Sequence, residues 1–215
     1  MFNLTPVVRI LLIINVLVYM VTNEAIIQQF GLHSFVAAQF NPIQILTHMF
    51  LHGGLNHIFS NMIGLIVFGP MLESYWGPKR FTFFYLFTGI GAAFLYGGIN
   101  YYEMQRVYEL YRDEFGGTFA QFATQYDQPM VGASGAIFGV IMGYGLLFPN
   151  TQLFLLFPPI PVKAKYLVIF YAAFELYSGV YRAQADNVAH FAHIGGMLFA
   201  FILVKYWGSQ GKTLY

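Results

Sequence analysis

Six mostly apolar stretches follow one another along the chain, separated by more polar segments, and they cover residues 4–22, 55–76, 81–100, 132–148, 164–180 and 187–207. A helix needs about 20 predominantly apolar residues to cross the hydrocarbon core of a bilayer. The pattern therefore predicts an all-α membrane protein, a bundle of six transmembrane helices. The fourth helix is expected to be short, because Pro149 ends its stretch and proline cannot continue a helix.

The whole chain, residues 1–215, is expected to form one transmembrane domain with two long outer connections. Residues 23–54 make the first connection. Residues 101–131 are the most charged part of the chain, and we expect an outer-side insertion there that folds as a surface helix or lid. Residues 153–162 contain three prolines and are expected to be an apolar loop that lies against the protein or the membrane interface.

The composition agrees with a membrane protein and excludes several classes of function. Hydrophobic residues make up 58% of the chain and charged residues 9%, whereas soluble domains carry about 25% charged residues. The net charge of +1 gives no reason to expect a nucleic-acid partner. The chain has no cysteine, which excludes disulfides, thiolate metal sites and a cysteine nucleophile.

The distribution of basic residues predicts the orientation of the bundle. Seven of the ten basic residues lie at the chain ends or in the 2–3 and 4–5 connections, namely Arg9, Lys79, Arg80, Lys163, Lys165, Lys205 and Lys212. Basic residues accumulate on the cytoplasmic side of a membrane. Both termini are therefore predicted to be cytoplasmic, and stretches two, four and six begin at the outer side.

Polar side chains occupy the outer ends of those same three stretches. His57 and Asn61 begin the second, Ser134 begins the fourth, and His190 and His193 begin the sixth. Ionisable groups inside a membrane are costly to bury, so they indicate function by default. Their common depth predicts one polar cavity that opens to the outside.

Small residues predict how the fourth and sixth helices pack. Glycine recurs at every fourth position directly after Ser134, at Gly135, Gly139 and Gly143. Such a face allows another helix to approach closely. Because the sixth stretch offers the matching pair Gly196 and Ala200, we expect Ser134 and His193 to meet. A serine seen alone in such a helix would more often be a packing residue.

Ser134 and His193 together predict nucleophilic catalysis. A serine hydroxyl needs a base within hydrogen-bond reach, and histidine titrates near physiological pH. Asp186 lies in a loop and is not expected to join them. Glu175 is the other candidate for a third member, but it is expected instead to make a polar contact at the outer end of its span. The pair is therefore interpreted as a dyad without a carboxylate.

His57 and Asn61 are four residues apart and share one helix face. One interpretation is a helix–helix hydrogen bond. The other is an oxyanion hole that also includes backbone N–H groups at Ser134, because the start of a helix leaves N–H groups unpaired. Zinc binding by histidines is the rival chemistry, but no cysteine or neighbouring carboxylate is expected to join them, and the spacing of His48 and His52 alone is weak evidence. We expect neither metal nor cofactor, and expect those two histidines to bond loop backbone.

Three short motifs resemble, in the same order, those of the rhomboid family of intramembrane serine proteases: HxxxN over residues 57–61, GxSG with Gly132, Ser134 and Gly135, and AHxGG over residues 192–196. The resemblance implies a six-helix core, catalysis by Ser134 and His193, and an oxyanion site at His57 and Asn61. It also implies no cofactor or metal, and substrates that are single-span membrane proteins in the lipid bilayer, cut near their outer end. The bacterial six-span form implies the inner membrane.

Two further positions acquire a meaning from the resemblance. Many rhomboids place a tyrosine that stacks on the catalytic histidine four residues after the serine, where this chain has Phe138. His190, one turn before His193, either lines the cavity or orients the catalytic ring. A non-catalytic rhomboid-like protein that binds membrane clients is the alternative function, and a small transporter or metal channel is a third. Nothing in the sequence specifies the substrate or the oligomeric state.

Overall fold

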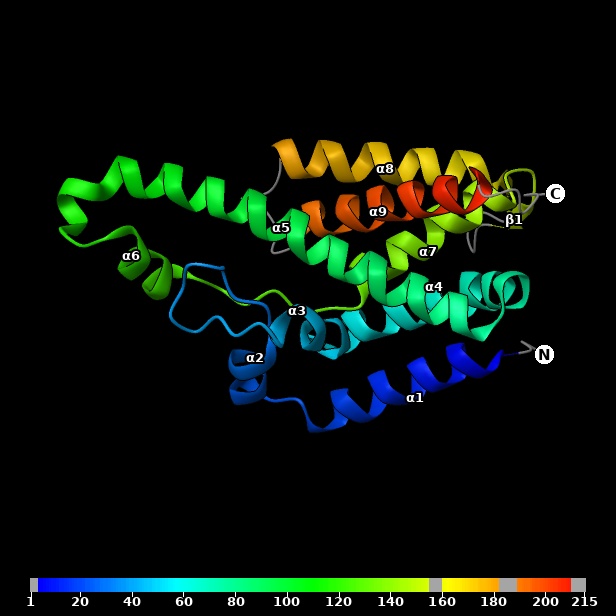
Figure 1. Cartoon of the computed structure of the whole chain (residues 1–215), viewed down its shortest axis with the longest axis horizontal. Helices are drawn as coiled ribbons and strands as arrows, with labels where there is room; N and C mark the ends of the chain where they lie inside the picture. Colours follow the sequence, from blue (N-terminus) through cyan, green and yellow to red (C-terminus); the bar gives the residue numbers. More distant parts are fainter. Residues whose placement is uncertain (1–3, 155–159, 182–188, 210–215) are drawn as a thin grey trace.

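The computed structural model of the protein describes residues 4–154, 160–181 and 189–209, and long helices dominate them (Figure 1). Each of the six predicted stretches corresponds to one long helix: α1 (Pro6–Val21), α4 (Leu55–Trp76), α5 (Pro78–Phe115), α7 (Ser134–Leu147), α8 (Ala164–Tyr181) and α9 (His190–Ser209). The first outer connection also contains short helices: α2 (Glu24–Phe30), α3 (Gln44–Thr47) and the 3₁₀ turn η1 (His48–Phe50). The prediction of an all-α bundle is confirmed.

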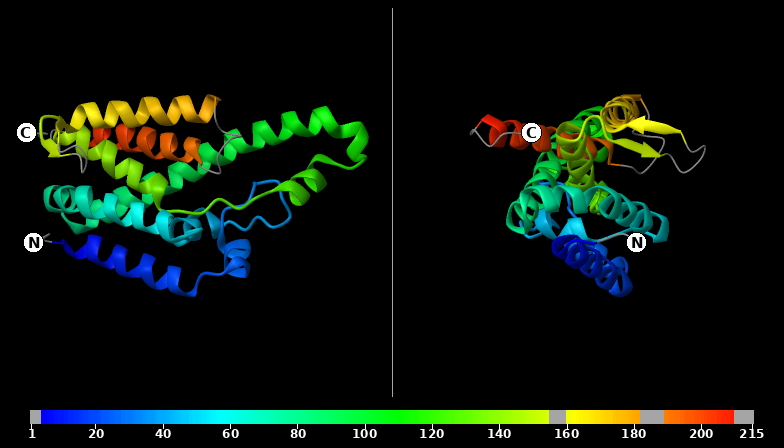
Figure 2. Two further views of the ribbon diagram at one scale, coloured as in Figure 1. Left: turned by 180° about the vertical axis from the view of Figure 1, so that it is seen from behind. Right: turned by 90° about the vertical axis from the view of Figure 1, so that its right-hand side faces the viewer.

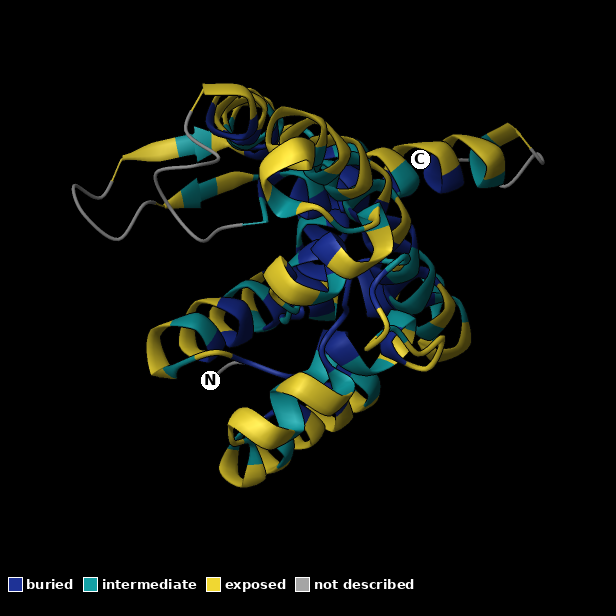
Figure 3. Cartoon of the chain, turned by 90° about the vertical axis from the view of Figure 1, so that its left-hand side faces the viewer, coloured by how far each residue is buried: buried dark blue, intermediate teal, exposed yellow. Residues whose placement is uncertain are grey.

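Three of these helices, α4, α5 and α9, are long and apolar enough to cross a membrane, and α1 and α7 are shorter apolar helices. The outside of the bundle carries large apolar side chains, for example Leu17 of α1, which is 58% exposed, and Ile169 of α8, which is 63% exposed. Figure 3 shows the buried residues between the helices and the exposed residues around the outside. An apolar exterior of this kind suits lipid, while the count of six spans stays a prediction.

Helix α7 is the central helix of the bundle. It packs against α4, α5, α8 and α9, and Figures 1 and 2 show α1 and α4 on one side of it and α8 and α9 on the other. It has 14 residues, most of them buried, and ends where Phe148 and Pro149 leave the helix. The predicted short fourth helix is thus enclosed by protein and is not exposed to lipid along its length.

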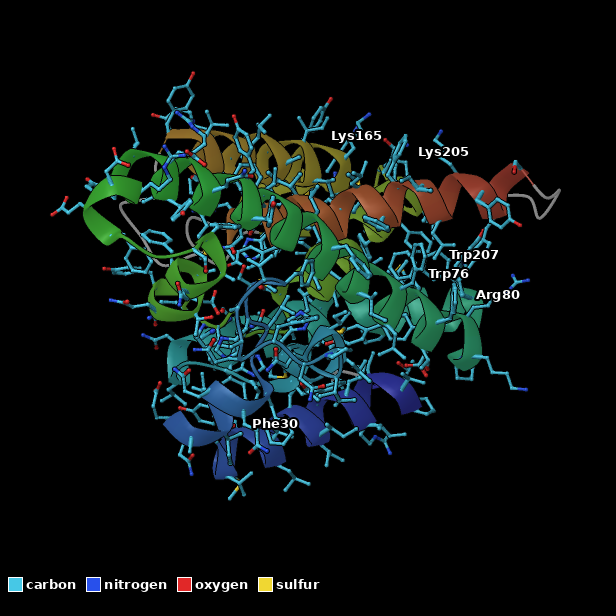
Figure 4. The ribbon with its side chains drawn as sticks, turned by 60° about the vertical axis from the view of Figure 1, so that its left-hand side comes forward. Phe30, Trp76, Arg80, Lys165, Lys205 and Trp207 are labelled. Atoms are coloured by element: carbon cyan, nitrogen blue, oxygen red, sulfur yellow. The ribbon has the colours of Figure 1, made fainter. Side chains whose placement is uncertain are left out.

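The helices are arranged so that α4, α7 and α9 all begin at one end of the bundle, while α1 begins at the other (Figure 1). Basic and aromatic side chains gather at the end of the bundle where α1 begins. The rings of Trp76 and Trp207 lie 5.2 Å apart and Arg80 stacks on Trp207 at 5.9 Å; Lys165 and Lys205 lie nearby (Figure 4). Amphipathic rings and cations of this kind are typical of a membrane–water interface.

Residues 101–131 differ in detail from the predicted insertion. Helix α5 does not stop at the end of the third span but continues without a break for 38 residues, about 57 Å at 1.5 Å per residue. Helix α6 (Phe119–Tyr126), which a capping box of Thr118 and Gln121 begins, then packs back on it through aromatic rings. The predicted surface helix is therefore an extension of a span.

The apolar loop predicted at residues 153–162 is partly wrong. Strands β1 (Gln152–Phe154) and β2 (Pro161–Lys163) flank residues 155–159, which lie outside the described residues, and pair antiparallel with Leu153 opposite Val162. Proline at the start of a short strand needs no N–H for the ladder. Side chains such as Phe154 project outward, with 69% exposed.

Candidate active site

Ser134 and His193 meet at the end of the bundle where α7 and α9 begin. The Nε2 atom of His193 lies 2.9 Å from Oγ of Ser134, which is a hydrogen-bond distance. His193 is 7% exposed, and Ser134 is only partly buried. The structure thus brings together the two residues predicted as nucleophile and base, and leaves the serine accessible.

The close approach of α7 and α9 explains why the two side chains meet. A Cβ atom placed on Gly196 would lie 1.8 Å from the carbonyl oxygen of Gly135 and 3.3 Å from the amide nitrogen of Gly139. The two backbones are therefore in direct contact, as the small-residue pattern predicted. The glycines of α7 depart from the predicted face, because Cβ atoms on Gly135, Gly139 and Gly143 would first meet Ala92, Thr88 and Phe84 of α5.

The loop before Ser134 is held by the first outer connection. Met130 pairs with Leu32 through two backbone hydrogen bonds of 2.9 Å, and the N–H of Gly132 donates to the carbonyl of His48 at 2.9 Å. Gly132 has a φ of 134°, and a Cβ there would lie 2.7 Å from Nε2 of His57. Both the backbone angle and the approach of the imidazole require glycine at this position.

Aromatic stacking fixes the ring plane of His193. The ring of Phe138, one helical turn after Ser134, lies 4.2 Å from the His193 ring, centroid to centroid, with 9° between the planes. Phe138 itself contacts Tyr171 of α8 edge to face. The stacking expected at this position is present with phenylalanine, because it depends on the ring and not on a hydroxyl.

His57 faces Ser134 from α4, and Asn61 lies one helical turn further along the same helix. The His57 ring lies against Gly132, and the position where Gly132 would carry a Cβ is 3.5 Å from Oγ of Ser134. Asn61 is 5% exposed, and its Nδ2 has no hydrogen-bond partner in the part of the chain that the structure describes. A buried amide donor without an acceptor is costly, so this one, a helical turn after His57, suggests an acceptor supplied by a ligand.

Glu175, the candidate third member that the sequence did not favour, lies beside His193. Oε2 of Glu175, in α8, lies 2.9 Å from Nδ1 of His193 and 2.6 Å from Nδ1 of His190. The expected contact of Glu175 at the outer end of its span exists, but its partners are these two histidines. The interpretation of Ser134 and His193 as a pair without a carboxylate stays a prediction, and Nδ1 of His193 makes no aligned hydrogen bond with Glu175 among the described residues.

Comparison of the chain with protein-family models shows which family it belongs to. The family model described as Rhomboid domain matches residues 39–210, most of the chain and all of the residues above. The chain belongs to the rhomboid family. Because rhomboids are proteins of the membrane, the apolar exterior of the helices is a lipid-facing surface and the chain is an integral membrane protein.

Individual rhomboids resemble this one at modest identity. RHOMBOID-like protein 12, mitochondrial, of Arabidopsis thaliana is 31% identical over 159 residues, which are 74% of this chain and 44% of that protein. Rhomboid protease AarA of Providencia stuartii is 30% identical over 171 residues, 74% of this chain and 55% of AarA. Putative rhomboid protease YdcA of Bacillus subtilis is 27% identical over 165 residues, 75% of this chain and 67% of YdcA. The matched part is thus about half the length of most of these relatives.

His48 and His52 lie behind the site in this rhomboid. His48 donates from Nδ1 to the carbonyl of Gln44 at 2.8 Å, as expected of a histidine that bonds loop backbone. The ring of His52 packs edge to face on that of His57, with 5.1 Å between the centroids, and its bond to loop backbone stays a prediction. Burial lowers the pKa of both histidines to about 4, and both are therefore neutral at physiological pH.

A buried contact between an imidazole and a carboxylate ties the two outer segments together at the same end. Nδ1 of His33 lies 2.5 Å from a carboxylate oxygen of Asp127, and the N–H of Ser34 donates to the other oxygen at 3.1 Å. Asp127 follows α6 directly. This contact anchors the insertion to the first outer connection, which also holds the loop before Ser134.

Proposed function

We propose that the protein is an intramembrane serine endopeptidase, in which Ser134 is the nucleophile and His193 its general base. The observation that carries the proposal is the 2.9 Å distance between Oγ of Ser134 and Nε2 of His193, within a family that contains named proteases. A hydroxyl becomes nucleophilic when a neighbouring base removes its proton.

The chemistry is acyl transfer in two steps. Oγ of Ser134 attacks the scissile carbonyl while Nε2 of His193 takes its proton, and the same nitrogen returns that proton to the leaving amine. Water then hydrolyses the acyl-enzyme. The developing oxyanion is stabilised by the side chains of Asn61 and His57 and by N–H groups at the start of α7. The unpaired Nδ2 of Asn61 supports this role.

The topology proposed for the protein follows from charge and from the position of the site. We propose one domain over residues 1–215, with six spans and both termini in the cytoplasm, because basic residues gather at the end opposite Ser134 (Figure 4). The site then opens to the outer side of a membrane, the inner membrane of a bacterium. Substrates are single-span proteins cut near their outer end, and the insertion within residues 101–131 rises beside the opening.

Wild-type protein in liposomes is expected to cut a test substrate that has one transmembrane helix. Because Ser134 lies at the outer end of α7, the cut should fall in the outer part of that helix or just beyond it. Mass spectrometry of the fragments locates the cut. An intact substrate, or cleavage confined to soluble loops, would contradict the proposal.

Asn61→Ala is expected to lower kcat about 10²–10³-fold, the effect of removing one oxyanion donor. The fold should remain, because the Nδ2 atom that is lost has no partner among the described residues. Cleavage kinetics and thermal unfolding in detergent measure both effects. Unchanged cleavage would mean that His57 and backbone N–H groups suffice and that Asn61 serves packing only.

A further inference from the structure

A carboxylate and two imidazoles form a buried cluster directly behind the proposed catalytic pair. Glu175 and His190 are each 4% exposed and His193 is 7% exposed. A single oxygen, Oε2 of Glu175, lies 2.6 Å from Nδ1 of His190 and 2.9 Å from Nδ1 of His193. A carboxylate at membrane depth is costly unless it is paired, so this geometry needs an explanation.

The proton positions on His193 are determined by the reaction. Nε2 faces Oγ of Ser134 and must be unprotonated to accept the serine proton. A neutral imidazole then carries its proton on Nδ1, which faces Glu175. An ionised carboxylate accepts hydrogen bonds and cannot donate them. Glu175 therefore favours the tautomer of His193 with the proton on Nδ1 over the one with the proton on Nε2.

The contact of Glu175 with His190 is the better aligned of the two. Nδ1 of His190 and Oε2 form a hydrogen bond, whereas Nδ1 of His193 makes no aligned hydrogen bond in the described part of the chain despite its 2.9 Å separation. Catalytic hydrogen bonds are often poorly aligned without substrate and tighten when it binds. His190 therefore holds the carboxylate, and the carboxylate faces the catalytic ring.

A metal ion is the rival occupant of this cluster, since the three ligand atoms lie within 4.8 Å of one another. Zinc binds at about 2.0–2.1 Å in a tetrahedron, which separates its ligand atoms by roughly 3.3 Å. The separations of 2.6 and 2.9 Å are shorter than that and match N–H···O contacts. The distances thus favour protons, not a metal, between these atoms.

We propose that Glu175 is a positioning residue that completes a Ser134–His193–Glu175 triad, with His190 as the residue that holds its carboxylate. The inference builds on the proposed function and adds a third member to its catalytic pair. Other groups facing the His193 ring are Phe138 from α7 and, across Ser134, His57 from α4. Glu175 from α8, in contrast, places a carboxylate at Nδ1 of His193.

Glu175→Gln is the test variant, because it keeps size and removes the charge. Its amide can donate to Nδ1 and so favour the tautomer with the proton on Nε2, which cannot act as the base. We expect kcat to fall about 10²-fold or more and KM to change less than about twofold. Nitrogen NMR of ¹⁵N-histidine protein in liposomes should show His193 protonated on Nδ1 in the wild type, and partly on Nε2 in the variant.

Ser178→Ala is the matched control, since Ser178 is buried one turn later on α8 and its hydroxyl has no partner among the described residues. It should leave kcat and the tautomer unchanged. Wild-type His193 protonated on Nε2, or Glu175→Gln with an unaltered kcat, would overturn the triad. So would stoichiometric zinc that is bound by the wild type and lost in Glu175→Gln.

The readouts separate this inference from the proposed function. If the wild type cuts no test span, the protease proposal fails. The NMR measurement then still reports whether the proton of His193 is on Nδ1, which faces Glu175, or on Nε2. If the wild type cuts and Glu175→Gln cuts equally well, only the triad fails.

Discussion

Ser134→Ala is expected to cleave a test span at least about 10³-fold more slowly than the wild type, because no other group can form the acyl-enzyme. The variant removes one oxygen from a partly buried position and should unfold at the same temperature. Initial rates in liposomes at saturating substrate measure the effect on kcat.

His193→Ala tests the same catalytic pair by removal of its base. When two residues act in one step, the effects of their substitutions on the rate do not add. The double variant of Ser134 and His193 should therefore be no slower than Ser134→Ala alone. A further loss in the double variant, or substantial cleavage by Ser134→Ala, would show that the two do not form one catalytic unit.

Gly196→Ala is expected to have the largest effect on stability. Its new Cβ would lie 1.8 Å from the carbonyl oxygen of Gly135, and that neighbour is backbone in a central helix, so neither helix can yield locally. Overpacking of this kind costs about 1–3 kcal/mol or more, enough to lower the unfolding temperature by several degrees. Separation of α7 from α9 should also abolish cleavage, because it moves His193 away from Ser134.

Gly98→Ala is the matched control for that variant. Gly98 also lies within a helix, but a Cβ there meets no atom within 4 Å. Alanine favours helix over glycine by up to about 1 kcal/mol, so the control should be as stable as the wild type or more so. Thermal unfolding in detergent compares the two, and equal unfolding temperatures for Gly196→Ala and the wild type would contradict the proposed helix contact.

Much of the fold is predictable from the sequence because membrane insertion imposes long apolar stretches. Each predicted stretch became one helix, since backbone groups in lipid must bond within their own segment. Boundaries outside the membrane were less predictable. Helix α5 runs on to Phe115 because no proline follows Pro78 within it, and Gly116, in a left-handed conformation, ends it.

The site was only partly predictable, for a physical reason. The meeting of Ser134 and His193 follows in part from a small residue visible in the sequence, because Gly196 lets α9 touch the backbone of α7, whereas the glycines of α7 face α5. The contact of Glu175 with His193 depends on the rotation of α8 about its axis. Apolar residues surround that helix on every side, so its sequence does not indicate which face meets α9. A carboxylate inside a span was the only available signal.

The central claim is that Ser134 is a nucleophile activated within the membrane, and its most direct test is covalent labelling with a fluorophosphonate. Wild-type protein in detergent or liposomes should be modified at Ser134, as located by mass spectrometry of peptides, and Ser134→Ala should remain unmodified. Such labelling also separates a protease from a rhomboid-like protein that only binds membrane clients. Wild-type protein that stays unlabelled while folded, or a label on another residue that persists in Ser134→Ala, would contradict the claim.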